Sequence, residues 1–253
     1  MKARQNIGPP PGWLLALEPR GAFELARLMF AAPVLAGAPR GDGRPVIVFP
    51  GLGVTDRSTW VLRAFLKRLG HDVSGWERGR NVRPARADLP DVSARVQRIY
   101  AATGTPVALV GWSRGGLIAR ETARLVPEAT RLVITLGTPF AAPGAANIVR
   151  TWRRLTGLPF VPPSAEEQAR LAAPLPVPST SIYSRSDGVV AWRACRETEG
   201  PQAENIEVRG AHIGLGHNPG ALWAIADRLA QPTGEWARFR PPPATAFWFP
   251  TPK

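Results

Sequence analysis

Between residues 45 and 230, short apolar runs alternate with longer segments whose apolar residues recur at helical spacing. Short apolar runs bounded by turn residues are typical of buried strands, whereas apolar residues three and four positions apart are typical of a helix that packs on one side. The predicted strands lie at residues 46–49, 71–76, 107–110, 131–136, 179–184 and 205–208, and the predicted helices lie at 58–69, 114–126, 220–230 and from about residue 91. This alternation predicts an α/β fold with a mainly parallel central sheet and helices on both faces.

The segments outside this alternation define the expected organisation of the chain. Residues 1–44 are expected to form an N-terminal helical decoration. Residues 45–232 form the expected main domain, in which the proline-rich stretch 140–178 is an insertion. Residues 233–253 form a tail rich in proline and aromatic residues, whose aromatic side chains should dock on another part of the chain.

The N-terminal segment carries apolar residues at helical spacing and is expected to pack on the body as a helix. One side of this helix is formed by Phe23, Ala26, Met29 and Phe30. The nearby apolar run 25–38 is interrupted by Arg27 and Pro33, whereas a secretory signal has an unbroken apolar core. No window of about 18 uncharged apolar residues occurs, so no transmembrane helix is expected. We therefore expect a cytoplasmic protein, with secretion as the alternative.

Composition and charge narrow the class of protein further. The 253 residues are 44% hydrophobic, and the single cysteine, Cys195, can form neither an internal disulfide nor a thiolate metal site. The formal net charge of +13 attracts nucleic acids and anionic membranes. Because no stretch interleaves basic and aromatic residues as a nucleic-acid module does, no nucleic-acid partner is expected. Peripheral contact with anionic lipid, or simply a solvated basic surface, fits the charge better.

The strongest motif is the run Gly111-Trp112-Ser113-Arg114-Gly115, which follows an apolar strand directly and precedes a helix. This pattern is the nucleophile elbow, a turn so sharp that only small residues fit two positions before and after the serine. Gly111 and Gly115 meet that requirement, so we expect Ser113 to be a nucleophile. A chance turn in a glycine-rich chain is the alternative.

A serine hydroxyl needs a histidine base to remove its proton, and the chain has three histidines. His71 precedes the elbow, whereas the elbow fold orders its catalytic residues as serine, acid and histidine along the chain. His212 follows the last predicted strand, where its side chain can point back at the serine. His212 is therefore favoured as the base over His217, which is interpreted as a loop or helix-capping residue.

The acid that orients the base is predicted to be Asp187, which lies just past the strand 179–184. Catalytic groups of open α/β sheets gather at the carboxyl ends of the strands. The other acids between Ser113 and His212 lie on the helix after the elbow or lack a strand-end context. The alternative for Asp187 is a simple Asp-Gly turn with Gly188.

The oxyanion formed during acyl transfer must meet backbone N–H groups that already point at it. One is predicted to come from Arg114, which follows the serine. The other is assigned to Leu52, in the glycine-containing loop after the strand 46–49. The alternative is that the glycines of this loop serve only a turn.

Three sequence blocks resemble α/β-hydrolase fold esterases and lipases, most closely the small bacterial triacylglycerol lipases. They are residues 45–53 (PVIVFPGLG), 107–116 (VALVGWSRGG) with 135–139 (TLGTP), and 180–190 (TSIYSRSDGVV) with 209–216 (RGAHIGLG). The resemblance implies an α/β-hydrolase fold in which Ser113, Asp187 and His212 form the catalytic triad. It also implies that Leu52 and Arg114 shape the oxyanion hole.

The insertion 140–178 contains one apolar stripe at helical spacing, formed by Ile148, Val149, Trp152 and Leu155. We expect a cap or lid whose stripe borders the acyl pocket, and a structural helix that covers the sheet is the alternative. Trp112 lies next to the serine. Trp112, Trp152 and Leu155 are therefore the candidate residues of the substrate pocket.

The expected function is hydrolysis of carboxylic esters, either small molecules or lipids, through an acyl-enzyme on Ser113 and without a cofactor. The same triad could instead pass the acyl group to an alcohol, which would make the protein an acyltransferase. A non-catalytic protein that docks on lipid or membranes is a further alternative. The presence of Ser113, Asp187 and His212 together argues against it, because a binding protein does not need all three.

Overall fold

The computed structural model describes residues 7–147 and 163–250. Its centre is a six-stranded sheet with the order β2-β1-β3-β4-β5-β6, in which all five strand pairs are parallel. The strands are β1 (Pro45–Phe49), β2 (Asp72–Gly75), β3 (Val107–Trp112), β4 (Thr130–Leu136), β5 (Ser179–Tyr183) and β6 (Ala203–Glu207). The prediction of a parallel α/β sheet is confirmed, and each predicted strand is present.

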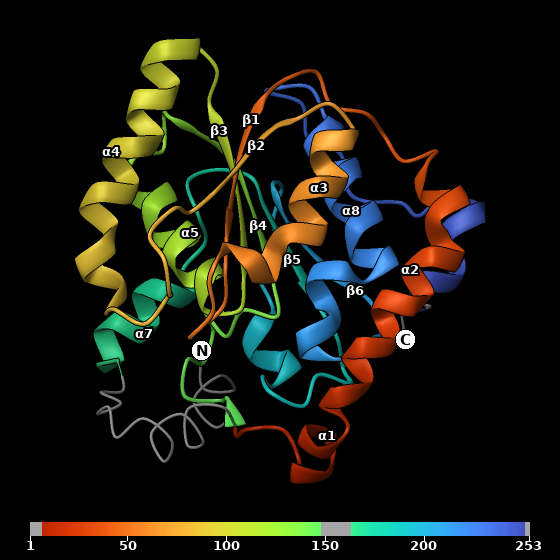
Figure 1. Cartoon of the computed structure of the whole chain (residues 1–253). Coiled ribbons are helices and arrows are strands. Elements are labelled where there is room, and N and C mark those ends of the chain that lie inside the picture. Colours follow the sequence, from red (N-terminus) through yellow and green to blue (C-terminus); the bar gives the residue numbers. More distant parts are fainter. Residues whose placement is uncertain (1–6, 148–162, 251–253) are drawn as a thin grey trace.

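Helices cover both faces of this sheet (Figure 1). One face carries α2 (Gly21–Leu35), α3 (Trp60–Arg68) and α8 (Pro219–Ala230), and the other carries α4 (Ala85–Thr103) and α5 (Arg114–Leu125). Alternate residues of a strand point to opposite faces. Val48 accordingly packs with the α2, α3 and α8 cluster, and Ile47 packs with the α4 and α5 cluster. Burial on both faces explains why the sequence of the central strands is continuously apolar.

The remaining elements are short and lie in the connections. The α-helices among them are α1 (Gly12–Ala16) and α7 (Ala165–Ala172). The 3-10 helices are η2 (Glu18–Arg20), η3 (Asp56–Thr59), η4 (Trp192–Cys195), η5 (His212–His217) and η6 (Pro243–Trp248). No helix within the two described ranges is both long and apolar enough to span a membrane.

The prediction placed the start of α4 too late, at about residue 91. The helix begins at Ala85 and contains Pro90 in its interior. Proline lacks the backbone N–H that helical hydrogen bonding uses, so a proline normally indicates a helix boundary. Here the helix continues through Pro90, and Leu89 and Val92 on either side are buried in the core.

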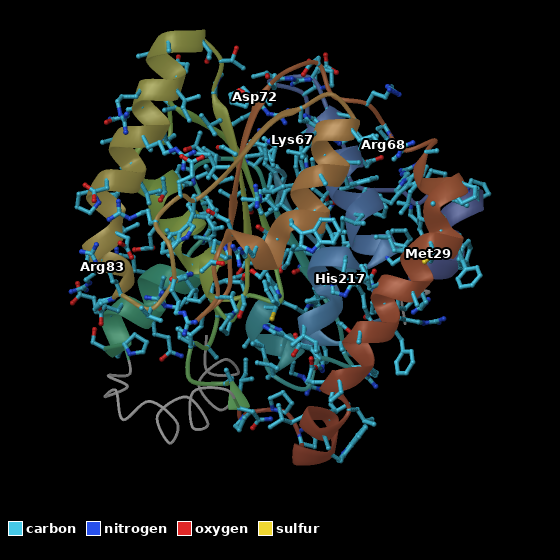
Figure 2. The ribbon with its side chains drawn as sticks, in the orientation of Figure 1. Met29, Lys67, Arg68, Asp72, Arg83 and His217 are labelled. Atoms are coloured by element: carbon cyan, nitrogen blue, oxygen red, sulfur yellow. The ribbon has the colours of Figure 1, made fainter. Side chains whose placement is uncertain are left out.

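The predicted packing side of the N-terminal helix α2 is wrong. Phe23, Met29 and Phe30 are 71%, 78% and 86% exposed, and Figure 2 shows Met29 on the outer side of the helix. The buried side instead includes Glu24 and Leu35. Glu24 faces inward because its carboxylate accepts a hydrogen bond from Asn218 Nδ2 at 3.0 Å. A polar contact thus determines which face is buried, which apolar periodicity alone could not reveal.

Three aromatic residues of the C-terminal tail, Phe239, Trp248 and Phe249, pack against the α8 side of the core, whereas Phe247 is exposed. Trp248 is buried beside Trp223, with ring centroids 6.2 Å apart, and Phe239 contacts Phe249 edge to face at 4.9 Å. The middle of the insertion 140–178, including the predicted stripe with Trp152 and Leu155, lies outside the described residues.

Candidate active site

Ser113 lies in the turn between the end of β3 and the start of α5. Its φ of 54° and ψ of −124° are rarely adopted by residues other than glycine, so the backbone at Ser113 is strained. A Cβ at Gly111 would lie 2.3 Å from the Cα of Gly116, and one at Gly115 would lie 2.5 Å from the carbonyl oxygen of Phe49. Both positions therefore require glycine, as the elbow motif predicts.

Asp187 and His212, which come from loops after β5 and β6, form a buried pair. Asp187 Oδ2 lies 2.6 Å from His212 Nδ1. The other carboxylate oxygen, Oδ1, accepts the N–H groups of Val189 at 2.8 Å and Val190 at 2.7 Å, so the carboxylate cannot rotate freely. Burial lowers the pKa of His212, but the charge and hydrogen bond of Asp187, with a further contribution from Glu18, outweigh burial and leave this pKa above its ordinary value.

Several contacts place this pair beside the elbow. A Cβ on Gly137, just after β4, would lie 2.9 Å from His212 Nδ1 and 3.1 Å from Asp187 Oδ2. Trp112, adjacent to the serine, donates its indole N–H to the His212 carbonyl oxygen at 3.2 Å. Within the described ranges the Ser113 hydroxyl makes no hydrogen bond. A nucleophile and its base are often loosely aligned in a protein without substrate.

The other two histidines lie elsewhere. His217 Nε2 is 2.9 Å from the Gly21 carbonyl oxygen, so this ring contacts the start of α2. His71 is buried just before β2, at the amino end of that strand. Because Ser113 follows the carboxyl end of a parallel strand, His71 lies at the opposite edge of the sheet.

Asn81 braces the predicted oxyanion loop and was missed by the sequence interpretation. This fully buried residue donates its side-chain N–H to the Pro50 carbonyl at 2.7 Å, and its own carbonyl accepts the Gly53 N–H at 2.8 Å. A Cβ on Gly51 would lie 3.5 Å from the Ser113 Cβ, so the loop passes beside the elbow. No sequence signal distinguishes Asn81 from an ordinary turn residue, because the loop atoms that it holds are backbone groups of a distant segment.

The Arg114 side chain is hydrogen-bonded to Asn81. Its guanidinium donates to Asn81 Oδ1 and to the Arg83 carbonyl oxygen, and burial lowers the pKa of Arg114. The residue that follows Ser113 is thus a cation. In the structure that cation is engaged with the loop before α4, while the backbone N–H of Arg114 is the group assigned to the oxyanion hole.

If the chain hydrolyses esters as its sequence predicts, Asn81→Ala is expected to lower kcat by up to about 10²-fold with little change in KM, because the loop that carries the Leu52 N–H loses its anchor. Steady-state kinetics measure this effect. Asn205→Ala is the matched control, since the Asn205 amide also bonds backbone atoms, those of Glu197, but lies away from the loop. A kcat for Asn81→Ala equal to that of Asn205→Ala would contradict the bracing role.

A second residue missed by the sequence interpretation is Glu18, which lies in the N-terminal segment. It is 5% exposed and accepts the backbone N–H groups of Gly188, His212 and Ile213. No group of three or more His, Cys, Asp or Glu residues that could hold a metal ion occurs in the described part of the chain.

Comparisons with known proteins support a hydrolase-like fold. No family model matches the chain. A triacylglycerol lipase of Burkholderia plantarii is 33% identical over 153 residues, which cover 54% of this chain and 41% of the lipase. The polyketide synthase ThaQ of Burkholderia thailandensis is 35% identical over 151 residues, which cover 53% of this chain and 7% of the synthase. The chain thus spans less than half the length of these curated relatives.

Solved structures show the same architecture. A structure from the metagenome-derived lipolytic enzymes LipS and LipT is 18% identical, with a TM-score of 0.54 over 76% of this chain and 93% of that one. The monoacylglycerol lipase of Paleococcus ferrophilus is 16% identical, with a TM-score of 0.53 over 74% of this chain and 96% of that one. The chain therefore has the α/β-hydrolase fold that its sequence motifs predict.

Proposed function

We propose that this protein hydrolyses carboxylic esters through an acyl-enzyme on Ser113. The observation that carries the proposal is the buried Asp187–His212 pair, with 2.6 Å between Oδ2 and Nδ1, beside a serine held in a strained elbow. This is the arrangement that activates a serine hydroxyl. The similarity to a triacylglycerol lipase supports the ester as the bond attacked.

In the proposed mechanism, Ser113 Oγ attacks the ester carbonyl carbon while its proton passes to His212 Nε2. The carbonyl oxygen becomes an oxyanion that accepts the N–H groups of Leu52 and Arg114. His212 then gives the proton to the departing alcohol oxygen, which leaves an acyl group on Ser113. Water then attacks the acyl carbon while His212 Nε2 takes its proton. The bond between the acyl carbon and Ser113 Oγ breaks, and His212 returns the proton to Oγ as the acid leaves. Asp187 holds the proton on His212 Nδ1 and stabilises the imidazolium.

The test is a series of p-nitrophenyl esters from butyrate to palmitate, assayed alongside covalent labelling by a serine-directed phosphonate. We expect turnover and labelling of the native protein. If native protein neither turns over any ester nor takes the label, the proposal fails. The base is tested by comparing His212→Ala with His217→Ala as its matched control, and a greater loss at His217 would overturn the assignment of His212.

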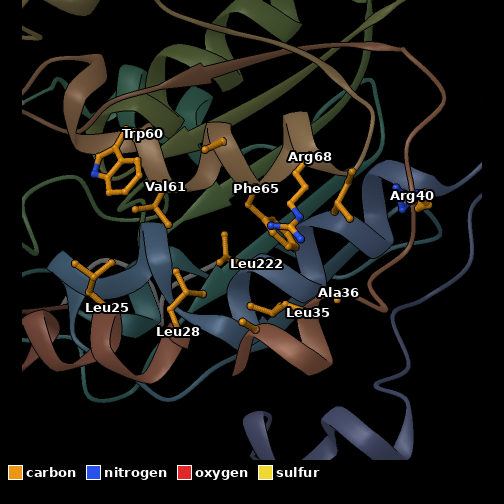
Figure 3. A pocket seen from close by; sticks show the side chains of 13 residues that line it. Leu25, Leu28, Leu35, Ala36, Arg40, Trp60, Val61, Phe65, Arg68 and Leu222 are labelled. Carbon is orange, nitrogen blue, oxygen red and sulfur yellow. The ribbon is translucent and has the colours of Figure 1, made fainter. Parts of the chain in front are cut away.

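We propose lipid esters as the substrate class and the α2–α3 side as a surface that contacts anionic lipid. A cavity of about 440 Å³ lies between α2 and α3 (Figure 3). Trp60 and Leu25 line one end, and Arg40 and Arg68 lie toward the other. Neither arginine makes a hydrogen bond or ion pair within the described ranges, so both are available to anionic groups. The exposed apolar side chains of α2 extend this surface.

Arg68→Gln is expected to weaken binding to phosphatidylglycerol vesicles roughly fivefold, because one cation near an anionic surface contributes about 1 kcal/mol. Binding to phosphatidylcholine vesicles should not change. Co-sedimentation measures both. Arg98→Gln is the matched control, since Arg98 is also an exposed helical arginine but lies on α4, across the sheet. Equal binding by the two variants would exclude the α2–α3 side as the contact surface.

A further inference from the structure

The N-terminal segment lies directly against the loops that carry Asp187 and His212. A Cβ on Gly188 would lie 2.2 Å from the Leu14 carbonyl oxygen, so the acid loop can approach α1 only because residue 188 is glycine. The Arg20 guanidinium donates to the Ser186 carbonyl. On the base loop, His217 contacts Gly21, as described above. Residues 14–21 therefore touch both loops.

Glu18 is the residue at which these contacts converge. Its Oε1 accepts the Gly188 N–H at 2.7 Å and the His212 N–H at 3.0 Å, and its Oε2 accepts the Ile213 N–H at 3.0 Å. One carboxylate oxygen, Oε1, is thus hydrogen-bonded both to Gly188, the residue after the candidate acid, and to His212, the candidate base. A displacement of either loop would lengthen a hydrogen bond to the same atom, so the carboxylate couples the positions of the two loops.

The contacts of Glu18 are hydrogen bonds to a buried charge and not only packing contacts. Burial of a carboxylate is costly unless hydrogen bonds compensate it, and here three backbone N–H groups do so. No cation pairs with Glu18 in the part of the chain that the structure describes. Its negative charge therefore acts on its surroundings, and Asp187 and Glu18 are the two charged groups that raise the pKa of His212.

We propose that Glu18 is a positioning residue, which holds the loop of Asp187 and the loop of His212 in a fixed relative position. Its negative charge also favours the protonated state that His212 takes during the reaction. This role rests on the proposed ester hydrolysis. It assigns a function to the N-terminal segment: that segment completes the site and is more than a decoration on the main domain.

The test compares Glu18→Gln, Glu18→Asp and the matched control Glu24→Gln, in which the other buried N-terminal carboxylate is neutralised. We expect Glu18→Gln to lower kcat/KM by about 10²-fold, because small displacements of reacting groups are costly and the amide N–H₂ would face the Ile213 N–H. Removal of the negative charge should also lower the pKa of His212. The acidic limb of the pH profile, where protonation removes the base, should therefore move to lower pH.

Glu18→Asp keeps the charge but is too short to meet all three N–H groups, so we expect a lower kcat with an unmoved acidic limb. A purely structural role would lower activity in Glu18→Gln and Glu18→Asp alike, and the acidic limb of the pH profile would stay in place. If Glu18→Gln matches Glu24→Gln in kcat/KM and in the position of the limb, the proposal is wrong.

Titration of the His212 ring by NMR separates this proposal from the proposed function, since it needs no turnover. We expect the His212 pKa to be lower in Glu18→Gln than in the native protein and unchanged in Glu24→Gln. An equal His212 pKa in native protein and Glu18→Gln would overturn the role of Glu18 even in an active esterase. Native protein without turnover or label would instead overturn the proposed function.

Discussion

Ser113→Ala is expected to lower kcat for p-nitrophenyl esters by about 10⁴-fold to 10⁶-fold and to abolish phosphonate labelling, because the nucleophilic oxygen is lost while the oxyanion hole remains. The fold should be retained. Alanine has the same Cβ as serine, so the strain at φ 54° is unchanged, and the residue 113 N–H keeps its bond to the Leu136 carbonyl at 2.7 Å.

Kinetics, labelling and thermal unfolding together measure this outcome. The free energy of unfolding should change by no more than about 0.5 kcal/mol, as for substitutions that remove no packed group or hydrogen bond. Ser93→Ala is the matched control, since Ser93 is another buried serine whose hydroxyl has no hydrogen-bond partner among the described residues. Persistent turnover in Ser113→Ala with a native fold would show that another residue performs the attack.

Asp187→Asn is expected to lower kcat by about 10⁴-fold without disturbing the fold, because it traps His212 in the wrong tautomer. Oδ1 of Asp187 accepts two backbone N–H groups, from Val189 and Val190. The oxygen of an asparagine amide must occupy that position, so its N–H₂ group faces His212 Nδ1. The imidazole then accepts at Nδ1 and carries its proton on Nε2, where it cannot remove the Ser113 proton.

Steady-state kinetics test this expectation, with Asp227→Asn as the control that makes the same chemical change on α8, away from the elbow. Activity of Asp187→Asn within tenfold of the native protein would reject Asp187 as the residue that orients His212. Asp187 would then be only the turn residue of its loop.

The sheet and the elbow could be predicted because both follow from local chemistry. A strand buried on both faces must be apolar throughout, so the run that ends at Phe49 is evident without any knowledge of its neighbours. The turn at Ser113 leaves no room for a side chain at Gly111 or Gly115, so the chain must place glycine there. The strand-end position of Asp187 is likewise visible in the order of the elements.

The helix α2 and the start of α4 could be predicted only in part. Glu24 would be expected on the solvated side of α2, yet its bond to Asn218 turns it inward and leaves Phe30 exposed. Pro90 indicates a helix boundary, yet α4 continues through it, and Leu89 and Val92 beside it are buried. In both cases tertiary contacts outweigh the local preference.

The sequence by itself determined the parallel sheet, the elbow at Ser113 and the candidate acid and base, because each depends on residues adjacent in the chain or on their order. Only the tertiary structure decided which distant groups support them. Glu18 lies 170 residues before Gly188 and 194 before His212, and Asn81 lies 31 residues after Pro50. Glu18 accepts from backbone N–H groups and Asn81 donates to a backbone carbonyl, and every residue type provides such groups. No pattern of side chains could therefore mark these contacts before the chain had folded.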